Sequence, residues 1–237
     1  QLKSILGIQV DVKGHVVTMS QQGYVEVLLD KFNMVDCNPV STPEVIGQVL
    51  KPSKLNPSQY LVTCTRPDIA NAVRNLSKHL SCYDESHWKQ AKRVLRYLKG
   101  TKSLCLKIDC TNQVGAFQVE AYCDAAFANS EDRRSIIKEL LWYIELLEEL
   151  GYPQGSIAVH CDNQSAIAIA KNPGHHERTK HISTKYHFVR DQVDKGRIQL
   201  RYCPTKLMIA DILTKAIPRV QFEILRSKMG LADGPTN

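Results

Sequence analysis

SIAVHCDNQSAIAIA, residues 156–170, contains the clearest indication of the fold. A short apolar run bounded by turn residues is typical of a buried strand in a parallel or central position. The Asp-Asn-Gln-Ser that follows supplies side chains that cap helices, so the stretch predicts a strand followed by a helix. In open α/β sheets, sites form beyond the carboxyl ends of such strands. Asp162 is therefore either a metal ligand or a helix cap, and the stretch alone leaves both interpretations open.

The composition bounds the class of protein. Of the 237 residues, 43% are hydrophobic and 23% are charged, which predicts one large globular domain or two small ones and excludes a disordered chain. No apolar run approaches the ~20 residues that span a bilayer, and the beginning of the chain has no signal-peptide pattern. The eight cysteines are scattered without a Cys-x-x-Cys pair, which predicts a reduced intracellular protein without a zinc site. The first residue, Gln1, favours a fragment of a longer protein.

The net charge of +7 favours an acidic partner, and nucleic acid is the commonest such partner of a basic chain. Part of the excess lies on a helix predicted over residues 86–99, opposite its apolar face. Five cations at helical spacing form one stripe with no Asp or Glu between them: Lys89, Lys92, Arg93, Arg96 and Lys99. We interpret this stripe as a binding surface for a phosphate backbone. The alternative is a solvated helix face.

The first half of the chain predicts a hairpin and several helices. Residues 5–19 predict a β-hairpin, because two apolar runs flank the turn Lys13-Gly14-His15. A helix is predicted over residues 21–34 from its apolar spacing, and a surface linker over residues 40–57 from its Pro, Ser and Thr content. Thr65-Arg66-Pro67-Asp68 predicts the beginning of another helix, since Pro suits a first turn and Asp complements the helix dipole.

The second half alternates strands and helices. Strands are predicted over residues 103–108, 116–123, 156–161 and 197–203. Helices are predicted over residues 136–150, 165–171 and 179–195, with a closing helical region from residue 209. From residue 116 onward, this order is that of an α/β domain with a mainly parallel sheet.

Three carboxylates hold comparable places in this domain. Asp124 and Asp162 each follow a predicted strand, and Asp211 begins a helix after a third strand. If the strands pair in parallel, the carboxylates converge on one edge of the sheet, where oxygen ligands without thiols favour Mg²⁺ or Mn²⁺. Two such ions are the usual device for hydrolysing a phosphodiester. Two-metal sites generally need about four carboxylates, and the sequence offers three.

A basic, histidine-rich stretch follows the predicted helix over residues 165–171. Its histidines are His175, His176, His181 and His187. No cysteine accompanies them at ligand spacing, and their basic neighbours disfavour a bound cation, so zinc is the weaker interpretation. We expect the stretch to contact backbone phosphates through Arg178, Lys180 and His181.

Several motifs occur in order along nearly the whole chain. They are Thr65-Arg66-Pro67-Asp68-Ile69, His87-Trp88, residues 92–101, Tyr122-Cys123-Asp124-Ala125, residues 162–167, residues 178–182, Tyr186-His187-Phe188 and residues 210–215. Together they resemble the C-terminal part of the Pol polyprotein of copia-type LTR retrotransposons. The resemblance implies the end of a reverse transcriptase palm and the start of its thumb over residues 1–45, then a linker and a helical thumb or connection over residues 46–110. Residues 111–237 would form a ribonuclease H-like domain.

The resemblance also implies the roles of the site residues. Asp124, Asp162 and Asp211 match three of the four catalytic, metal-binding carboxylates of ribonuclease H, whose substrate is an RNA–DNA hybrid. The fourth, a Glu at the start of a helix after two further strands, has no counterpart. Residues 125–135 are too few for two strands with tight turns, which need ~15 residues. The resemblance therefore implies an internal deletion near residues 135/136 that removed the segment with this Glu. The alternative is that Glu139 supplies the fourth carboxylate.

The expected architecture is α/β: a ribonuclease H-like domain with a reduced, mainly parallel sheet, after a mostly helical region with an N-terminal hairpin. The deletion leaves the strand over residues 116–123 at a sheet edge. The expected function is that of a retrotransposon fragment that binds RNA–DNA hybrid, with two-metal hydrolysis weakened or lost. Its expected location is a cytoplasmic particle or the nucleus, its further partner the rest of a Pol polyprotein, and no membrane partner is expected. The alternatives are a non-catalytic nucleic-acid-binding module and a pseudogene product.

Overall fold

A computed structural model describes residues 4–5, 7–47, 64–78, 84–111, 118–124, 130–171 and 188–234, without the side chains of residues 5, 130–136 and 169. The chain divides into two units. The first comprises residues 1–112 and 212–237, and the second comprises residues 113–211. The second unit is therefore inserted between two segments of the first. Among the described helices, none is both long enough and apolar enough to cross a membrane.

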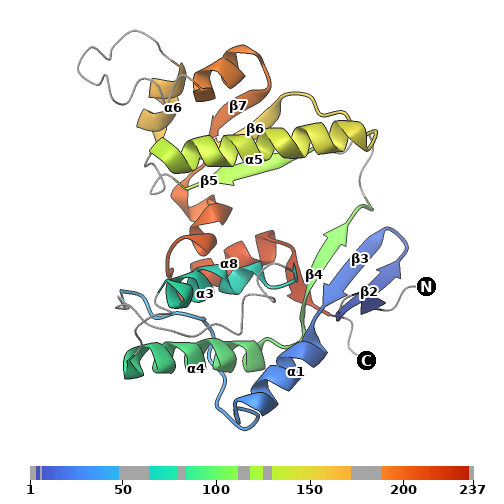
Figure 1. Ribbon diagram of the computed structural model, residues 1–237, viewed down its shortest axis with the longest axis vertical. Helices are drawn as coiled ribbons and strands as arrows, with labels where there is room; N and C mark the ends of the chain where they lie inside the picture. Colours follow the sequence, from blue (N-terminus) through green and yellow to red (C-terminus); the bar gives the residue numbers. More distant parts are fainter. Residues whose placement is uncertain are drawn as a thin grey trace. The chain divides into compact units, whose positions relative to one another are not determined.

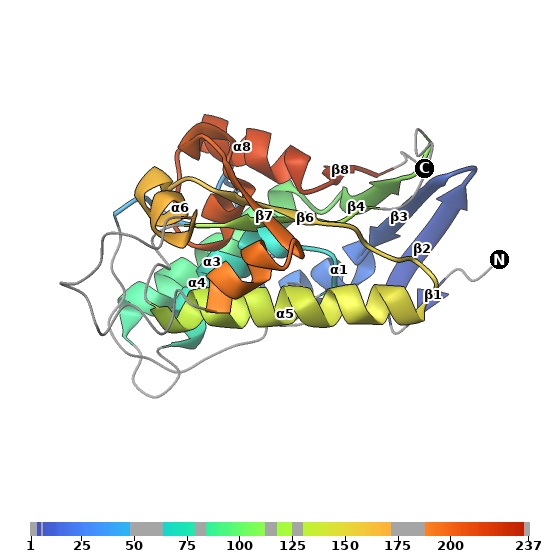
Figure 2. The ribbon, with the colours of Figure 1, turned by 90° about the horizontal axis from the view of Figure 1, so that it is seen from above.

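The first unit contains an antiparallel sheet of five strands in the order β1-β2-β3-β4-β8 (Figure 2). The strands are β1 (Ser4–Ile5), β2 (Ile8–Lys13), β3 (Val16–Ser20), β4 (Leu104–Asp109) and β8 (Leu231–Asp233). Strands β2 and β3 form the predicted hairpin, with Lys13 opposite Val16 and Gly14 at a positive φ of 60° in the turn. This conformation is one that glycine adopts without steric cost. The predicted N-terminal hairpin is confirmed.

The helices of the first unit share one apolar core. They are α1 (Gln22–Lys31), the short 3₁₀ helix η1 (Pro67–Ile69), α3 (Ala70–Ser77), α4 (Glu85–Gly100) and α8 (Arg219–Lys228). The core is built from apolar side chains of all of them, among them Val25, Leu28, Ile69, Val73, Val94, Leu98, Phe222 and Leu225. Burial of apolar side chains is the main stabilising contribution to such a unit.

The end of the chain belongs to the first unit. Phe222 and Leu225 lie in its core, and β8 pairs with β4, with Leu106 opposite Leu231. Gly230 allows the turn into β8: its φ is 84°, and a Cβ at this position would lie 2.9 Å from the Lys107 carbonyl oxygen. The sequence analysis assigned residues 111–237 to one domain, whereas the structure groups residues 212–237 with residues 1–112.

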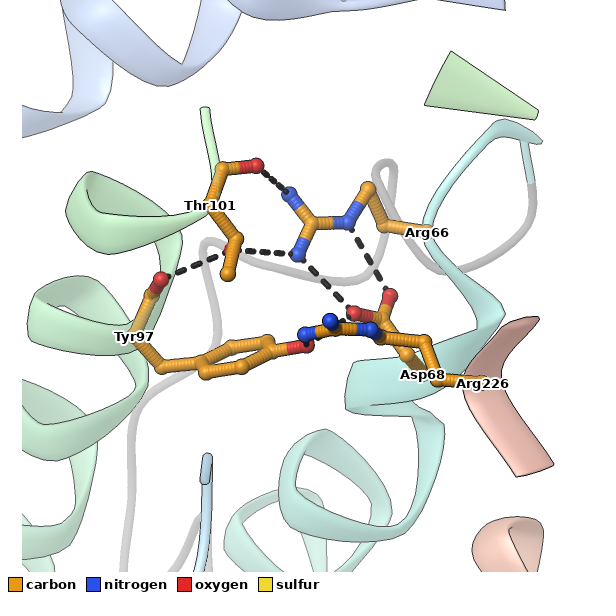
Figure 3. A network of polar contacts seen from close by, with 5 residues as sticks. All are labelled: Arg66, Asp68, Tyr97, Thr101 and Arg226. Atoms are coloured by element: carbon orange, nitrogen blue, oxygen red, sulfur yellow. Dashed lines mark hydrogen bonds and ion pairs between the residues drawn. The ribbon is translucent and has the colours of Figure 1, made fainter. Parts of the chain in front are cut away.

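A buried polar network joins η1, α4 and α8 (Figure 3). Arg66 donates through Nε and Nη2 to the two carboxylate oxygens of Asp68, at 3.0 and 2.9 Å. Its guanidinium also donates to the carbonyl and hydroxyl oxygens of Thr101, at 3.0 and 2.7 Å. The Tyr97 hydroxyl donates to Asp68 and accepts from Arg226 Nη1 at 3.1 Å. The helix predicted at Thr65-Arg66-Pro67-Asp68 does begin there, and the same residues carry the unit's central ion pair.

The second unit contains a parallel sheet in the order β5-β6-β7. Its strands are β5 (Glu120–Cys123), β6 (Ile157–Cys161) and β7 (Ile198–Tyr202). Among the residues described in this unit, these three strands are the whole sheet, so β5 lies at its edge as predicted. Residues 116 and 117, with which the predicted strand begins, lie outside the described part of the chain.

Helix α5 (Ser130–Glu149) lies along this sheet (Figure 1). Its Ile137, Leu140 and Ile144 pack with Ile157 and Ile198 in a second apolar core. The helix begins at Ser130, six residues before the predicted start at Ile136. The connection from β5 to α5 is correspondingly short.

Helix α6 (Gln164–Lys171) follows β6, as predicted. The next predicted helix, over residues 179–195, is described only from residue 188, and residues 188–194 are helical. After β7 come two short 3₁₀ helices, η3 (Thr205–Leu207) and η4 (Ile209–Leu213). This last segment carries Asp211 to the sheet.

Candidate metal centre

Two of the three predicted carboxylates are placed by parallel strand pairing. Asp124 follows the last residue of β5 and Asp162 the last residue of β6. The register aligns Cys123 with Cys161, so the two aspartates leave the sheet side by side at the carboxyl ends of adjacent strands.

The third carboxylate is placed by the turns that follow β7. The Cys203 amide donates to the Cys161 carbonyl oxygen at 2.9 Å, which continues the pairing with β6 beyond the end of β7. The Met208 amide then donates to Thr205 at 3.2 Å, and the Asp211 amide donates to Met208 at 3.1 Å. Met208 is fully buried and belongs to a small apolar cluster with Cys203 and the partly buried Tyr122. The segment is thereby anchored on the sheet, and Asp211 is held at its end.

The structure brings these three residues together. One carboxylate oxygen from each of Asp124, Asp162 and Asp211 lies within 4.8 Å of the other two. Asp211 is 0% and Asp124 4% exposed, and Asp162 is half-buried. In the part of the chain that the structure describes, no other trio of His, Cys, Asp or Glu side chains is gathered in this way.

The donor set fits a hard divalent cation. Carboxylates gathered in a buried place repel one another, and a cation bound between them relieves this repulsion. All three donors are oxygens, which suits Mg²⁺ or Mn²⁺ and not a thiol-seeking metal. The three residues together could hold such a cation.

The fourth carboxylate remains without a counterpart among the described side chains. Glu139, the alternative candidate, is exposed on α5 and does not belong to the aspartate cluster. The position of a helical residue fixes the direction of its side chain, and the buried face of α5 is occupied by Ile137, Leu140 and Ile144. Glu139 therefore does not supply the missing ligand.

The sheet face beside the aspartates carries a polar and aromatic group. The rings of Tyr122 and His160 are stacked, with centroids 4.7 Å apart. Tyr122 donates to Glu120 at 3.2 Å, and His160 Nε2 lies 3.6 Å from the same carboxylate. Burial raises the pKa of Tyr122, and the neighbouring Glu120 carboxylate raises it further. Alternate residues of a strand share a face, so Tyr122 and His160 are on the side of Asp124 and Asp162.

Thr205 is a site neighbour that the sequence analysis missed. Its hydroxyl donates to Asp162 Oδ2 at 3.4 Å. The signal in the sequence was slight: a hydroxyl residue two positions after Cys203, without a motif of its own. Only the turn at η3 reveals that this residue faces the strand end of β6.

The predicted cationic stripe lies on α4, but its members have different partners. Lys89 pairs with Glu85 at 3.0 Å, one turn earlier on the helix. Lys92 lies over the ring of Trp88, 5.2 Å from its centroid. Both lysines are exposed. They are the members of the stripe that face solvent most openly.

The other three cations hold the segment that follows α1. Arg93 donates to the Thr42 hydroxyl at 3.0 Å. Arg96 donates to the carbonyl oxygen of Asn38, and Lys99 to that of Cys37 at 2.7 Å. Burial lowers the pKa of Arg93, and the charge of Arg96 lowers it further.

Gly100 completes this contact. A Cβ at Gly100 would lie 2.9 Å from the Cβ of Pro39, and the Val40 amide donates to the Arg96 carbonyl oxygen at 3.4 Å. Three members of the stripe therefore have structural partners. The other nucleic-acid-binding candidates, Arg178, Lys180 and His181, lie outside the described residues.

The chain is similar to Pol polyproteins from several plant transposons. The chain is 30% identical, over 97% of its length, to the retrovirus-related Pol polyprotein from transposon TNT 1-94 of Nicotiana tabacum. It is 30% and 29% identical, over 99% of its length, to the retrovirus-related Pol polyproteins from transposons RE2 and RE1 of Arabidopsis thaliana. It spans about a fifth of each relative, 21% of the tobacco protein and 19% of the other two. No protein-family model and no solved structure matches the chain significantly.

The alignment with the tobacco protein is longer than the chain itself. It extends over 289 positions, 52 more than the 237 residues of the chain. At least that many positions of the relative have no counterpart in this sequence. The corresponding region of the relative is thus longer than this chain.

Proposed function

We propose that this chain is a fragment of a copia-type retrotransposon Pol polyprotein that joins the end of a reverse transcriptase to a reduced ribonuclease H domain. The second unit would bind a divalent cation and an RNA–DNA hybrid, and its hydrolysis of the hybrid would be weak or lost. The observation that carries the proposal is the convergence of Asp124, Asp162 and Asp211 within 4.8 Å. The similarity to Pol polyproteins from transposons supports the same assignment.

The sheet and the carboxylates together support the proposed domain. Parallel strands β5 and β6 deliver two aspartates at their carboxyl ends, and the segment after β7 delivers the third. Divalent cations held there would supply the activation of a water and the stabilisation of the leaving oxygen that phosphodiester hydrolysis needs. The three aspartates would hold the cation. Asp124 and Asp211 are buried, so neighbouring atoms restrict their rotamers and keep their carboxylate oxygens in place.

The loss of hydrolysis is proposed from the donor count. Three carboxylates are enough to hold one Mg²⁺, which retains several waters of its own. A second ion needs further donors, and among the described side chains Glu139 does not provide one. The excess of 52 alignment positions supports a deletion, which we place near residues 135/136.

The test is cleavage of an RNA–DNA hybrid in the presence of Mg²⁺ or Mn²⁺, with calorimetric titration of Mn²⁺ on the same protein. We expect Mn²⁺ binding that Asp162→Asn weakens at least tenfold, and slow or undetectable cleavage. Rapid cleavage that disappears in Asp162→Asn would show that three carboxylates suffice. Absence of Mn²⁺ binding to the unchanged protein would overturn the metal centre itself.

A second candidate is a nucleic-acid-binding module without catalysis. Lys89 and Lys92 favour this function, because they are the exposed cations of the α4 stripe and are accessible to a phosphate backbone. Fluorescence anisotropy with a labelled hybrid in EDTA would separate the two functions. Binding that persists without metal and weakens in the double variant Lys89→Glu, Lys92→Glu supports the module.

A further inference from the structure

We propose that Thr205 is a positioning residue of the metal centre, which orients the Asp162 carboxylate towards the other two aspartates. This inference rests on the proposed function, because it takes Asp124, Asp162 and Asp211 to be ligands of a divalent cation. The observation that supports the inference is the hydrogen bond of 3.4 Å that Thr205 Oγ1 donates to Asp162 Oδ2.

Asp162 is the member of the trio that most needs an external restraint. Asp211 and Asp124 are 0% and 4% exposed, so surrounding atoms limit their rotamers. Asp162 is half-buried, and a side chain open to solvent retains rotamer freedom that metal binding must remove. A hydroxyl bonded to Oδ2 restricts this freedom. Partners of this kind commonly determine the affinity of a metal site.

Thr205 is itself held in place by its backbone. Its carbonyl oxygen accepts from the Met208 amide at 3.2 Å, and the Leu207 amide donates to Pro204 at 2.8 Å. Met208 is fully buried against the sheet. The η3 turn is thus anchored by Met208, and it presents the hydroxyl of Thr205 to the end of β6.

The side chain of Thr205 is exposed, which makes the inference testable. Its replacement leaves no cavity in the core, so an effect on the metal centre is separable from an effect on folding. A matched control exists on the first unit. Thr111 also donates its hydroxyl to an aspartate, Asp109, at 2.6 Å, and this pair is exposed.

The experiment is titration of the metal-free 237-residue chain with Mn²⁺, followed by electron paramagnetic resonance of the free ion. The variants are Thr205→Val, which keeps the shape and loses the hydroxyl, Thr205→Ser, which keeps the hydroxyl, and the control Thr111→Val. We expect Thr205→Val to weaken Mn²⁺ binding about threefold to tenfold. Thr205→Ser should stay within about twofold of the unchanged protein, and Thr111→Val should have no effect.

The outcomes separate the two proposals. Equal affinity of Thr205→Val and the unchanged protein overturns the role of Thr205 and leaves the proposed function standing. Loss of affinity that Thr205→Ser fails to rescue also overturns it, because the effect then does not come from the hydroxyl. If the unchanged protein binds no Mn²⁺, the proposed function fails and this inference fails with it. Thermal unfolding without metal verifies that each variant is folded. If Thr205→Val does not fold, Thr205→Ala takes its place.

Discussion

Tyr97 donates a hydrogen bond to Asp68 where both side chains are buried, although 29 positions separate them in sequence (Figure 3). Asp68 also receives both hydrogen bonds of the Arg66 fork, and Tyr97 accepts from Arg226 near the end of the chain. The segment before α3, helix α4 and helix α8 are thus joined through one carboxylate and one phenol. Buried polar groups are costly when a partner is missing, so the stability of the first unit should depend on this network.

Replacement of Tyr97 by Phe tests this dependence. The substitution removes the donor to Asp68 and the acceptor of Arg226 while it retains the ring. We expect the free energy of unfolding to fall by about 1–3 kcal/mol, because partner groups are left buried without their hydrogen bonds. Urea unfolding followed by circular dichroism measures the change. Tyr143→Phe, at a residue that is 51% exposed, should change it by less than about 0.5 kcal/mol.

The same residue predicts a dependence on alkaline pH. Burial raises the pKa of Tyr97 well above its ordinary value of 10.0, and the Asp68 charge raises it further against the lowering effects of Arg66 and Arg226. The folded state therefore retains the phenolic proton in a range above pH 10 where the unfolded state loses it, so stability should fall as pH rises through that range. Urea unfolding at a series of alkaline pH values should show a smaller decline in Tyr97→Phe. Equal declines in both proteins would contradict the assignment.

The guanidinium of Arg66 cannot be replaced by another cation. Its side chain is 2% exposed and its fork contacts Asp68 and Thr101 together. Burial lowers the pKa of Arg66, but Asp68 and, to a smaller extent, Tyr97 together outweigh this, so the pKa is raised and the residue stays charged. Arg66→Lys should destabilise the protein by roughly 2–4 kcal/mol, because one ammonium cannot satisfy these acceptors. Arg219→Lys, at an exposed pair with Glu223, should cost less than about 1 kcal/mol, as measured by the same urea unfolding.

Local patterns predicted the elements well, and for physical reasons. The apolar run Ile157–Cys161, the turn Lys13-Gly14-His15 and the Pro at the beginning of η1 each restrict the backbone within a few residues. The aspartates followed from the rule that sites form at the carboxyl ends of parallel strands. These parts of the fold depend on short-range chemistry, so the sequence shows them directly.

The remaining features depend on partners far away in the sequence. The pairing of β8 with β4 joins residues more than 120 positions apart, and three residues are too few to show alternation. The spacing of the cations on α4 would be the same whether they bind phosphates or backbone carbonyl oxygens. Only the position of Cys37 and Asn38 in the structure shows that Arg96 and Lys99 donate to carbonyl oxygens. The contact of Thr205 with Asp162 depends on the turn at η3, which the sequence pattern did not predict.

Gly100 provides a test of the contact between α4 and the segment after α1. In an ordinary helix position Gly→Ala stabilises by up to about 1 kcal/mol. Gly23, in the first turn of α1, has room for this change, since a Cβ added there would meet no neighbouring group within 4 Å, whereas a Cβ at Gly100 would lie 2.9 Å from the Cβ of Pro39. Gly23→Ala should therefore raise the midpoint of thermal unfolding and Gly100→Ala should lower it. If both variants are stabilised, residues 37–43 are not seated on α4.

The cations of the α4 stripe should separate into a structural and a solvent-facing group. Arg96→Gln removes the donor to Asn38 and should lower the free energy of unfolding by about 1 kcal/mol. Lys89→Gln removes only an exposed pair with Glu85, so its effect on stability should stay below about 0.5 kcal/mol. Anisotropy with a labelled RNA–DNA hybrid then assigns the binding role: Lys89→Gln should weaken binding and reduce its salt dependence. If hybrid affinity instead falls in Arg96→Gln while its stability is unchanged, Arg96 contacts phosphate and its bond to Asn38 is not what holds the segment.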